Sequence, residues 1–303
     1  MKKKILIGPS SFGQKNKEPL YKISNAGYEI ISNPFNRKIT KHEILNLLDD
    51  SKIIGLLAGL ETLDDEVLSS SNLKVVSRVG SGISNIDLDS IKKNNIKFYS
   101  TPHGPVDSVA ELTVGNMINL LRNIIPMNNN LHNGNWSRII GNEIKGKKIL
   151  IVGFGRIGKK VAKILKALEA EIYISDPYID NKSINNEYTI INLKEALSFI
   201  DIITVHISGE ECVISEQELS MVKKGIFICN ASRGGTINED ALIKAVKKNI
   251  VAGAWIDAFV EEPYYGQMNN INEIILTPHI GSYTIECRYN MEMEATKSLL
   301  ENL

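Results

Sequence analysis

The stretch ILIVGFGRIGKKVAKIL, residues 149–165, joins an apolar run to an amphipathic segment through three glycines. Gly153, Gly155 and Gly158 have the spacing G-x-G-x-x-G, which by itself is a weak signal. Here the preceding run predicts a strand and the following segment predicts a helix, which is the context of a dinucleotide-binding loop. The first glycine permits a tight turn, the second lets the backbone approach a pyrophosphate, and the third lets the helix pack against the strand. The stretch therefore predicts a dinucleotide site.

An acidic residue supports this interpretation. Asp176 follows the last glycine by 18 positions and ends the next strand-like run. A carboxylate there accepts hydrogen bonds from a ribose diol and repels a 2′-phosphate, so it favours NAD over NADP. Arg156, inside the loop, is either a pyrophosphate contact or a solvated side chain. A glycine-rich turn without a ligand is the alternative for the loop as a whole.

Short apolar runs alternate with amphipathic segments along the rest of the chain. The first set of runs is 4–8, 28–32, 53–59, 74–80 and 96–100. The second set is 147–153, 171–175, 201–207, 225–229, 251–257 and 273–277. Strands that alternate with helices predict parallel sheets joined by right-handed crossovers. Two such sets in 303 residues predict an α/β fold with two doubly wound, Rossmann-like parallel-sheet domains.

The join between the two sets contains a helix and an arm. Residues 106–124 predict one long helix that ends near Pro126. Residues 131–146 are typical of an extended arm and carry Trp136. Residues 282–303 predict a final helix, which could close either domain.

The composition excludes several functional classes. The 35 Lys and Arg residues balance 35 Asp and Glu residues, which gives no support to nucleic-acid or membrane partners. No stretch is long enough to span a membrane, and the apolar run after MKKK is too short for a signal peptide. Cys212, Cys229 and Cys287 are too widely spaced to suggest a disulfide framework or a zinc site. We therefore expect a cytoplasmic protein without a metal.

Polar residues follow the ends of three strand-like runs of the second set. They are Arg233 in NASRGG, Glu261 and Glu262 in DAFVEEP, and His279 in TPHIG. In open α/β sheets, ligands bind at the carboxyl ends of the strands. Each residue has a structural alternative: an ion pair for the arginine, a solvated loop for the glutamates, and a core position for the histidine. Their joint occurrence on the edge that also holds the glycine loop favours a site.

These side chains suit hydride transfer on a 2-hydroxy acid. His279 is the acid–base candidate, because imidazole titrates near neutral pH. Glu262 would orient the imidazole and favour its protonated form. Arg233 offers a planar fork that binds a carboxylate through two hydrogen bonds and can polarise a carbonyl. We therefore expect Arg233 to be both a catalytic and a substrate-binding residue.

The motifs together resemble the D-isomer-specific 2-hydroxyacid dehydrogenases, in particular the 3-phosphoglycerate dehydrogenase-like members. The resemblance lies in GFGRIG (153–158) with Asp176, and in NASRGG, DAFVEEP and TPHIG, which have the family's order Arg, Glu, His. Upstream, SRVGSGISNIDL (77–88) is similar to the substrate-domain loop, and SVAELTVG (108–115) is similar to the interdomain helix. The resemblance covers about residues 50–285.

The resemblance implies a set of site residues. Arg233, Glu262 and His279 would be catalytic, and Asp257 would meet the nicotinamide carboxamide of NAD. The implied NAD contacts are Gly153, Gly155, Arg156, Ile157, Gly158, Asp176, His206, Ala231 and Asp257. The implied substrate contacts are Arg78, Val79, Gly80, Ser81 and Arg233, with the backbone of residues 79–81 holding the substrate carboxylate.

The resemblance also implies a division of the chain. Residues 1–100 and 283–303 would form a discontinuous, flavodoxin-like substrate-binding domain. Residues 101–282 would form the NAD-binding Rossmann domain, with an arm at 101–145 that mediates homodimerisation.

One departure from the family concerns the substrate. Phosphoglycerate dehydrogenases carry an arginine around the position of Ala58 for the distal phosphate, and the run LLAGLE has none. Arg78 and Arg138, the second from a partner subunit, remain candidate contacts for a distal anion. We expect an NAD-dependent oxidoreductase that interconverts a D-2-hydroxy acid and its 2-keto acid. Phosphohydroxypyruvate, phosphonopyruvate, hydroxypyruvate and glyoxylate all remain open as the keto acid.

Two other functions remain as alternatives. An NADH-sensing, corepressor-like binding protein can retain the same three residues, and only turnover separates it from an enzyme. Formate or phosphite dehydrogenase chemistry is a weaker alternative, because a carboxylate at Glu262 fits acid–base work on a hydroxyl better.

Overall fold

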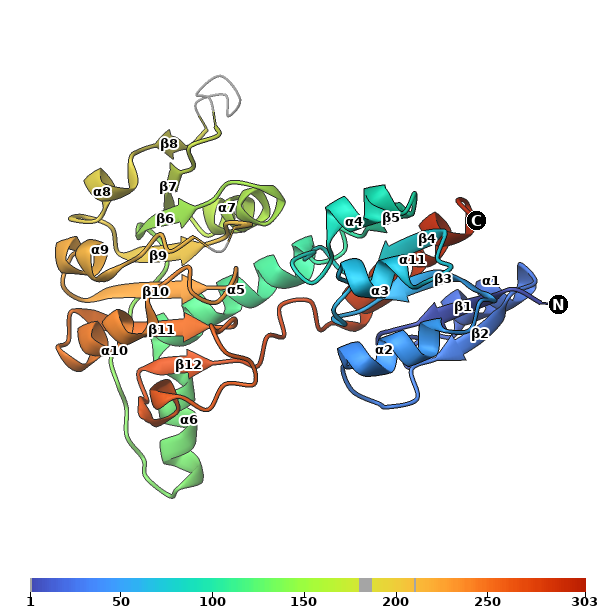
Figure 1. The fold of residues 1–303 in the computed structure, drawn as a ribbon. Helices are drawn as coiled ribbons and strands as arrows, with labels where there is room; N and C mark the ends of the chain where they lie inside the picture. The colour runs from blue at the N-terminus through green and yellow to red at the C-terminus, as the bar shows by residue number, and fades with distance from the viewer. Residues whose placement is uncertain (1, 180–186, 210) are drawn as a thin grey trace. The chain divides into compact units, whose positions relative to one another are not determined.

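A computed structural model describes residues 2–179, 187–209 and 211–303. The chain forms two compact units, one that runs to Pro105 and resumes at Ser282, and one that comprises Val106–Gly281. Every strand pair in both units is parallel, which confirms the predicted α/β fold with two parallel sheets (Figure 1).

The first unit contains a five-stranded sheet of order β2-β1-β3-β4-β5, which is the flavodoxin-like order. Its strands are β1 (Lys4–Ile7), β2 (Glu29–Ser32), β3 (Ile53–Ala58), β4 (Val75–Arg78) and β5 (Lys97–Ser100). Its helices are α1 (Glu18–Asn25), α2 (Lys41–Leu48), α3 (Asp65–Ser69), α4 (Leu88–Lys93) and α11 (Ile285–Leu300). Apolar residues of α2, α3 and α4 pack on one face of the sheet, and those of α1 and α11 pack on the other. The predicted final helix is thus confirmed as α11 and belongs to this unit.

The second unit contains a seven-stranded sheet of order β12-β11-β10-β9-β6-β7-β8, which can be followed from bottom to top in Figure 1. Its strands are β6 (Lys148–Val152), β7 (Glu171–Ser175), β8 (Thr189–Ile190), β9 (Ile202–Val205), β10 (Ile226–Asn230), β11 (Val251–Ile256) and β12 (Ile274–Leu276). Its helices are α5 (Val106–Arg122), α6 (Ile124–His132), α7 (Arg156–Ala167), α8 (Leu193–Ala196), α9 (Glu216–Met221), α10 (Glu239–Lys247) and the 3₁₀ turn η2 (Gln267–Asn270). The strand order reverses between β6 and β9, as in Rossmann folds.

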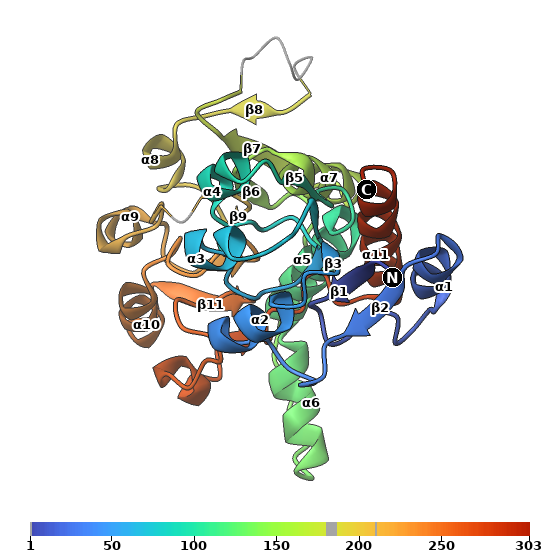
Figure 2. The same ribbon diagram turned by 45° about the vertical axis from the view of Figure 1, so that its right-hand side comes forward.

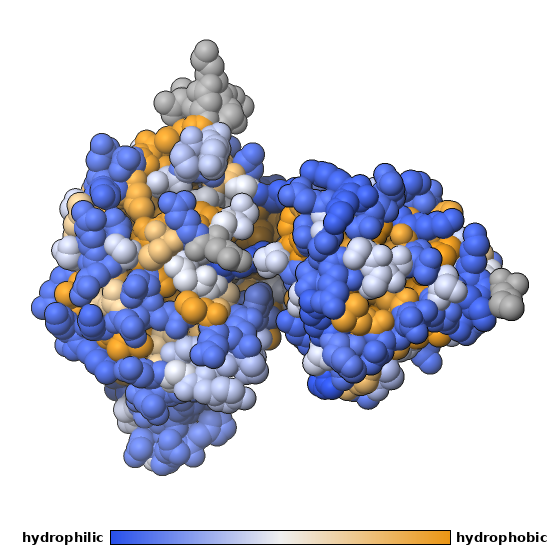
Figure 3. All heavy atoms as spheres, viewed as in Figure 1, coloured by the Kyte–Doolittle hydropathy of each residue, from blue (hydrophilic) through white to orange (hydrophobic). Residues whose placement is uncertain are grey.

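The helices of this unit cover both faces of its sheet. Buried residues of α5 and α7 pack against one face, and those of α9 and α10 pack against the other. Helix α6 instead extends away from the rest of the unit (Figure 2). On the surface seen in Figure 3, hydrophilic residues predominate in each unit and apolar residues form separate patches. Among the described residues, no helix has the length and apolarity that a membrane span requires.

The expected end of the long helix at Pro126 is wrong. Helix α5 ends earlier, at Arg122, because Asn123 adopts a left-handed backbone conformation with φ of 51°. Helix α6 then begins at Ile124, so Pro126 lies in its first turn. Proline is tolerated there, because the first N–H groups of a helix have no partner within the helix. Beyond α6, residues 135–143 have no regular secondary structure, which agrees with the expected extended arm.

Candidate functional site

The strands of the second sheet end level with one another. Ser175 pairs with Val152, Val152 with Val205, and Val205 with Asn230. The register continues from Asn230 to Ile256 on β11, and from Ile256 to Leu276 on β12. The residues that follow these strand ends are Asp176, Gly153, His206, Ala231, Asp257 and Thr277. Five of the six are residues that the sequence analysis assigned to NAD, and adjacent strands lie about 4.8 Å apart, so the row suits an elongated ligand.

The glycine loop lies in this row with the backbone geometry that a dinucleotide requires. Gly153 has φ of 91°, and a Cβ atom there would come within 2.8 Å of the His206 backbone. A Cβ atom on Gly158 would come within 2.2 Å of the Gly153 carbonyl oxygen, so this glycine permits close packing of α7. A Cβ atom on Gly155 would meet no described atom within 4 Å. Gly155 caps the N-terminus of α7, so its open side is left for an anion.

Asp176 holds the loop from the neighbouring strand. Its Oδ2 atom accepts the N–H of Phe154 at 2.7 Å, and its Oδ1 atom accepts the N–H of Tyr178 at 2.8 Å. A carboxylate has about four acceptor positions, so both oxygens can still accept a hydroxyl. Asp176 is half-buried, and its negative charge fits a ribose diol and disfavours a 2′-phosphate.

His206 is a buried histidine with one unsatisfied ring nitrogen. Its Nε2 atom lies 2.8 Å from Thr204 Oγ1, whereas its Nδ1 atom has no partner among the described residues. Burial lowers the pKa of His206 from 6.5 to about 3, so the ring is neutral. A buried polar atom without a partner is costly, and a ligand beside the glycine loop would remove that cost.

Arg233 lies in a tightly held turn after β10. Its carbonyl oxygen accepts hydrogen bonds from Asn230 Nδ2 at 3.0 Å and Thr236 Oγ1 at 2.7 Å. A Cβ atom on Gly234 would collide with the Phe259 carbonyl oxygen, so the turn packs directly on the loop after β11. The guanidinium, half-buried, donates through Nη1 to the Ser232 carbonyl oxygen at 2.8 Å. Its other N–H groups can therefore bind a carboxylate.

Glu262 and His279 come together from the loops after β11 and β12. The Nδ1 atom of His279 lies 2.9 Å from Oε2 and 3.0 Å from Oε1 of Glu262. Glu262 Oε1 also accepts the N–H of Phe259 at 3.0 Å. Phe259 is the residue against which Gly234, in the turn of Arg233, packs. With Nδ1 engaged by the carboxylate, the Nε2 atom of His279 is the nitrogen left to exchange a proton with a substrate.

Asp257 uses most of its hydrogen-bonding capacity within the protein. It is buried, and its carboxylate accepts the hydroxyl of Thr277 at 2.6 Å and the N–H groups of Ile280 and Gly281, each at 2.9 Å. These bonds clamp the loop that carries His279. Burial raises the pKa of Asp257, and the three hydrogen bonds oppose this shift. At most one acceptor position remains for a nicotinamide carboxamide.

The proposed carboxylate-binding residues of the first unit follow β4. The N–H of Val79 donates to the Ala58 carbonyl oxygen at 3.0 Å, and that of Gly80 donates to Thr101 Oγ1 at 2.8 Å. Two of the three expected backbone donors are therefore already engaged. Ser81 is exposed, and in the described part of the chain no acceptor faces its N–H.

Arg78 is buried and turns its guanidinium toward this loop. It donates through Nε to the Gly82 carbonyl oxygen at 3.1 Å and through Nη1 to the Val79 carbonyl oxygen. These bonds draw two carbonyl groups inward and leave the intervening N–H of Ser81, unlike that of Gly80, available to face an anion. Arg78 thus fixes the conformation of the loop after β4, and the loop, not the arginine side chain, would contact the substrate.

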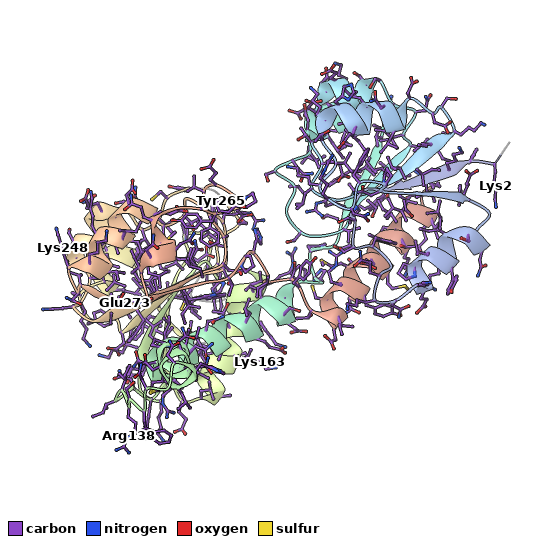
Figure 4. The ribbon with its side chains drawn as sticks, turned by 90° about the horizontal axis from the view of Figure 1, so that it is seen from below. Lys2, Arg138, Lys163, Lys248, Tyr265 and Glu273 are labelled. Atoms are coloured by element: carbon purple, nitrogen blue, oxygen red, sulfur yellow. The ribbon has the colours of Figure 1, made fainter. Side chains whose placement is uncertain are left out.

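The arm after α6 is largely exposed. The side chain of Trp136 is 81% exposed and that of Ile140 is 98% exposed. Arg138 lies at the periphery of the second unit and points outward (Figure 4). Within its own chain it therefore takes no part in the row of residues along the sheet edge.

The sequence analysis missed several supporting residues. Thr277 accepts the Trp255 indole N–H at 2.9 Å and donates to Asp257, and Thr101 accepts from Gly80. Glu61 is buried and its Oε1 atom accepts the N–H of Gly59 at 2.7 Å. The threonines carry no signal beyond their place at strand ends. Glu61 stands in the quoted run LLAGLE, but a lone glutamate in a loop predicts an exposed position.

Comparison with known proteins identifies the family. Residues 114–281, more than half of the chain, match the family model "D-isomer specific 2-hydroxyacid dehydrogenase, NAD binding domain". A hydroxypyruvate reductase from Thermotoga maritima is 30% identical over 274 residues, which cover 88% of this chain and 89% of the relative. A D-3-phosphoglycerate dehydrogenase from Methanocaldococcus jannaschii is 33% identical over 259 residues, which cover 82% of this chain but 49% of the relative.

A solved structure shows the same fold at low sequence identity. D-lactate dehydrogenase from Aquifex aeolicus, complexed with NAD and lactic acid, superimposes with a TM-score of 0.83 and 23% identity. The match covers 97% of this chain and 93% of that structure. The chain spans about half the length of the phosphoglycerate dehydrogenase that it matches, but nearly the whole hydroxypyruvate reductase. The glycine loop, the level strand ends and these matches together place the chain in the D-isomer specific 2-hydroxyacid dehydrogenase family, as an NAD-dependent oxidoreductase.

Proposed function

We propose that this chain reduces a small 2-keto acid to the D-2-hydroxy acid with NADH, and catalyses the reverse oxidation with NAD. The observation that carries the proposal is the contact of His279 Nδ1 with Glu262, beside the turn that holds Arg233. An imidazole oriented by a carboxylate, next to an arginine with free donors, is the set of groups that a 2-keto acid needs.

The roles of the three side chains follow from the chemistry. Bound NADH supplies a hydride to C2 of the keto acid. His279 donates a proton from Nε2 to the carbonyl oxygen, so that a hydroxyl forms as the C–H bond forms. Glu262 keeps Nδ1 hydrogen-bonded and stabilises the imidazolium before the transfer. Arg233 binds the substrate carboxylate and polarises the carbonyl.

The first unit would bind the substrate carboxylate through its loop after β4, with Ser81 as the main backbone donor. Under this proposal the unit formed by residues up to Pro105 and from Ser282 is the substrate-binding domain. The names of the relatives suggest hydroxypyruvate, glyoxylate and phosphohydroxypyruvate as substrates to test, and phosphonopyruvate extends the set. The three cysteines are unpaired in the structure, which is compatible with a cytoplasmic setting.

The experiment that tests the proposal follows NADH absorbance with glyoxylate, hydroxypyruvate, pyruvate and phosphohydroxypyruvate. We expect turnover with at least one of them, and a loss of about a hundredfold or more in kcat/KM in Arg233→Lys, because lysine lacks the planar fork. NADH affinity should be unchanged in this variant. Tight NADH binding without turnover of any keto acid would contradict an enzyme and support a sensor of NADH.

We further propose that the protein is a homodimer assembled through the arm. Trp136 and Ile140 expose large apolar side chains close together on the arm, where a second copy of the chain would bury them. The expected result is a dimer mass by light scattering for the wild type and a monomer for Trp136→Ala/Ile140→Asp. Replacing the exposed Tyr178 by Ala is the control that should remain dimeric.

A further inference from the structure

Two charged side chains are buried at the carboxyl edge of the five-stranded sheet. Glu61 and Arg78 are both buried, at 1% and 7% exposure. Desolvation raises the pKa of Glu61, and the positive charge of Arg78 is among the influences that lower it, so the two groups interact. A Cβ atom on Gly8 would collide with the Glu61 carboxylate, which shows how closely the loop after β1 covers it.

This buried pair shapes the two central loops of the edge. Glu61 Oε1 accepts the N–H of Gly59, and Arg78 holds the carbonyl groups of Val79 and Gly82. Asn85 joins the loops, because its Nδ2 atom donates to the carbonyl oxygens of Gly59 at 3.3 Å and Glu61 at 2.5 Å. Both loops are therefore held by the buried Glu61 and Arg78 together with the partly buried Asn85.

The side chains that these loops present outward are apolar. Leu60, between the two anchored residues Gly59 and Glu61, is 61% exposed, and Ile83, in the loop after β4, is 37% exposed. Residues 59–64 and 79–87 contain no lysine or arginine. A phosphoryl or carboxylate tail placed beside these loops would lose its hydration without gaining a cation.

Two lysines of neighbouring segments are relevant, Lys41 on α2 and the exposed Lys38 of the loop after β2. The Nζ atom of Lys41 lies 2.7 Å from Asp64 Oδ2 and 2.5 Å from Glu66 Oε2, so its charge is already paired. Lys38 influences Glu61 electrostatically, so it is included in the test.

We infer that the substrate is a 2-keto acid with an uncharged alkyl tail, which Leu60 and Ile83 select. The loops that carry these two residues are held in place by Glu61, Arg78 and Asn85. The inference rests on the proposed function, because it specifies the tail of the acid whose carboxylate and carbonyl that proposal assigns. It assigns Leu60 as a specificity-determining residue, and it disfavours acids that carry a distal phosphate.

The test compares two four-carbon acids that differ by one carboxylate, 2-oxobutyrate and oxaloacetate, with glyoxylate as the acid without a tail. We expect kcat/KM for 2-oxobutyrate to exceed that for oxaloacetate by about a hundredfold or more, because a buried unpaired charge discriminates more strongly than a methylene. Phosphohydroxypyruvate should be as poor as oxaloacetate. In Leu60→Arg the ratio should shift toward oxaloacetate by at least about tenfold.

A matched control introduces the same charge elsewhere. Tyr21 on α1 is also 61% exposed, so Tyr21→Arg should leave the ratio unchanged. A wild-type preference for oxaloacetate or phosphohydroxypyruvate would overturn the inference, and its loss in Lys38→Ala would identify the cation responsible. An unchanged ratio in a folded Leu60→Arg variant would overturn it as well. Failure of all four acids, glyoxylate and phosphohydroxypyruvate included, would instead remove the proposed function itself.

Discussion

The Nδ1 atom of His279 lies 2.9 Å from Oε2 of Glu262, and Oε1 of the same carboxylate accepts the N–H of Phe259. The two side chains are 49% and 39% exposed, so water screens their attraction and the pair contributes little to stability. Its role is instead to fix the direction of the imidazole. The loop of His279 is in turn held by Asp257, which accepts the N–H groups of Ile280 and Gly281.

The first prediction concerns this pair. Glu262→Gln should lower kcat for keto-acid reduction by about ten- to a hundredfold, because the imidazolium loses its neighbouring negative charge. NADH affinity should not change. Steady-state rates with a 2-keto acid at neutral pH measure the effect. Glu261→Gln, which changes the adjacent exposed carboxylate, is the control, and an equal loss there would refute a specific role for Glu262.

The second prediction separates folding from cofactor binding at the glycine loop. Gly158→Ala should destabilise the fold by about 1–3 kcal/mol, because the new Cβ atom would lie 2.2 Å from the Gly153 carbonyl oxygen. Gly155→Ala should cost less than about 1 kcal/mol, because its Cβ atom meets no described atom within 4 Å. The same variant should raise the Kd for NADH at least about tenfold, since the methyl group stands where a pyrophosphate approaches.

Urea unfolding and fluorescence titration with NADH measure these two effects. If Gly155→Ala bound NADH as tightly as the wild type, the pyrophosphate would not lie at this glycine.

The third prediction concerns cofactor choice. Asp176→Asn keeps the size of the side chain and removes the charge, and its amide oxygen can still accept one of the two N–H groups that the carboxylate accepts. The ratio of kcat/KM with NADPH to that with NADH should rise by about tenfold, because a 2′-phosphate is no longer repelled. Glu171→Gln, at the opposite end of β7, should leave the ratio as it is. An unaltered preference in Asp176→Asn would mean that another residue reads the ribose.

The fourth prediction follows from the burial of His206, which lowers its pKa from 6.5 to about 3. Between these values the unfolded chain binds a proton that the folded chain does not, so the stability of the fold falls as pH decreases. The loss is at most about 1.4 kcal/mol for each pH unit below 6.5. His206→Gln cannot titrate, so the difference in unfolding free energy between wild type and variant should shrink from pH 7 to pH 4. Urea unfolding at each pH measures this difference, and a constant difference would show that His206 is protonated in the fold.

The sequence alone determined the fold class and most of the second unit's edge. Period-two apolar runs and a glycine loop are local signals, and parallel strands necessarily present their carboxyl ends on one side of a sheet. This reasoning placed Gly153, Asp176 and His279 on this edge because each lies within three residues of the end of a recognisable strand. It failed at Pro126, because proline ends a helix in its interior but is accepted in a first turn, and the left-handed turn at Asn123 has no strong sequence signal.

Only the tertiary structure decided which hydrogen-bond partners each side chain has and which side chains are buried. The sequence does not show that the Asp257 carboxylate accepts hydrogen bonds from the loop that carries His279, or that the N–H of Gly80 already donates to Thr101. Nor does it show that Glu61 and Arg78 are buried together while Leu60 faces outward. The physical reason is that these contacts join residues far apart in the chain. Burial and the direction of a hydrogen bond depend on the packing of several loops at once, whereas a sequence pattern reports only the element in which a residue lies.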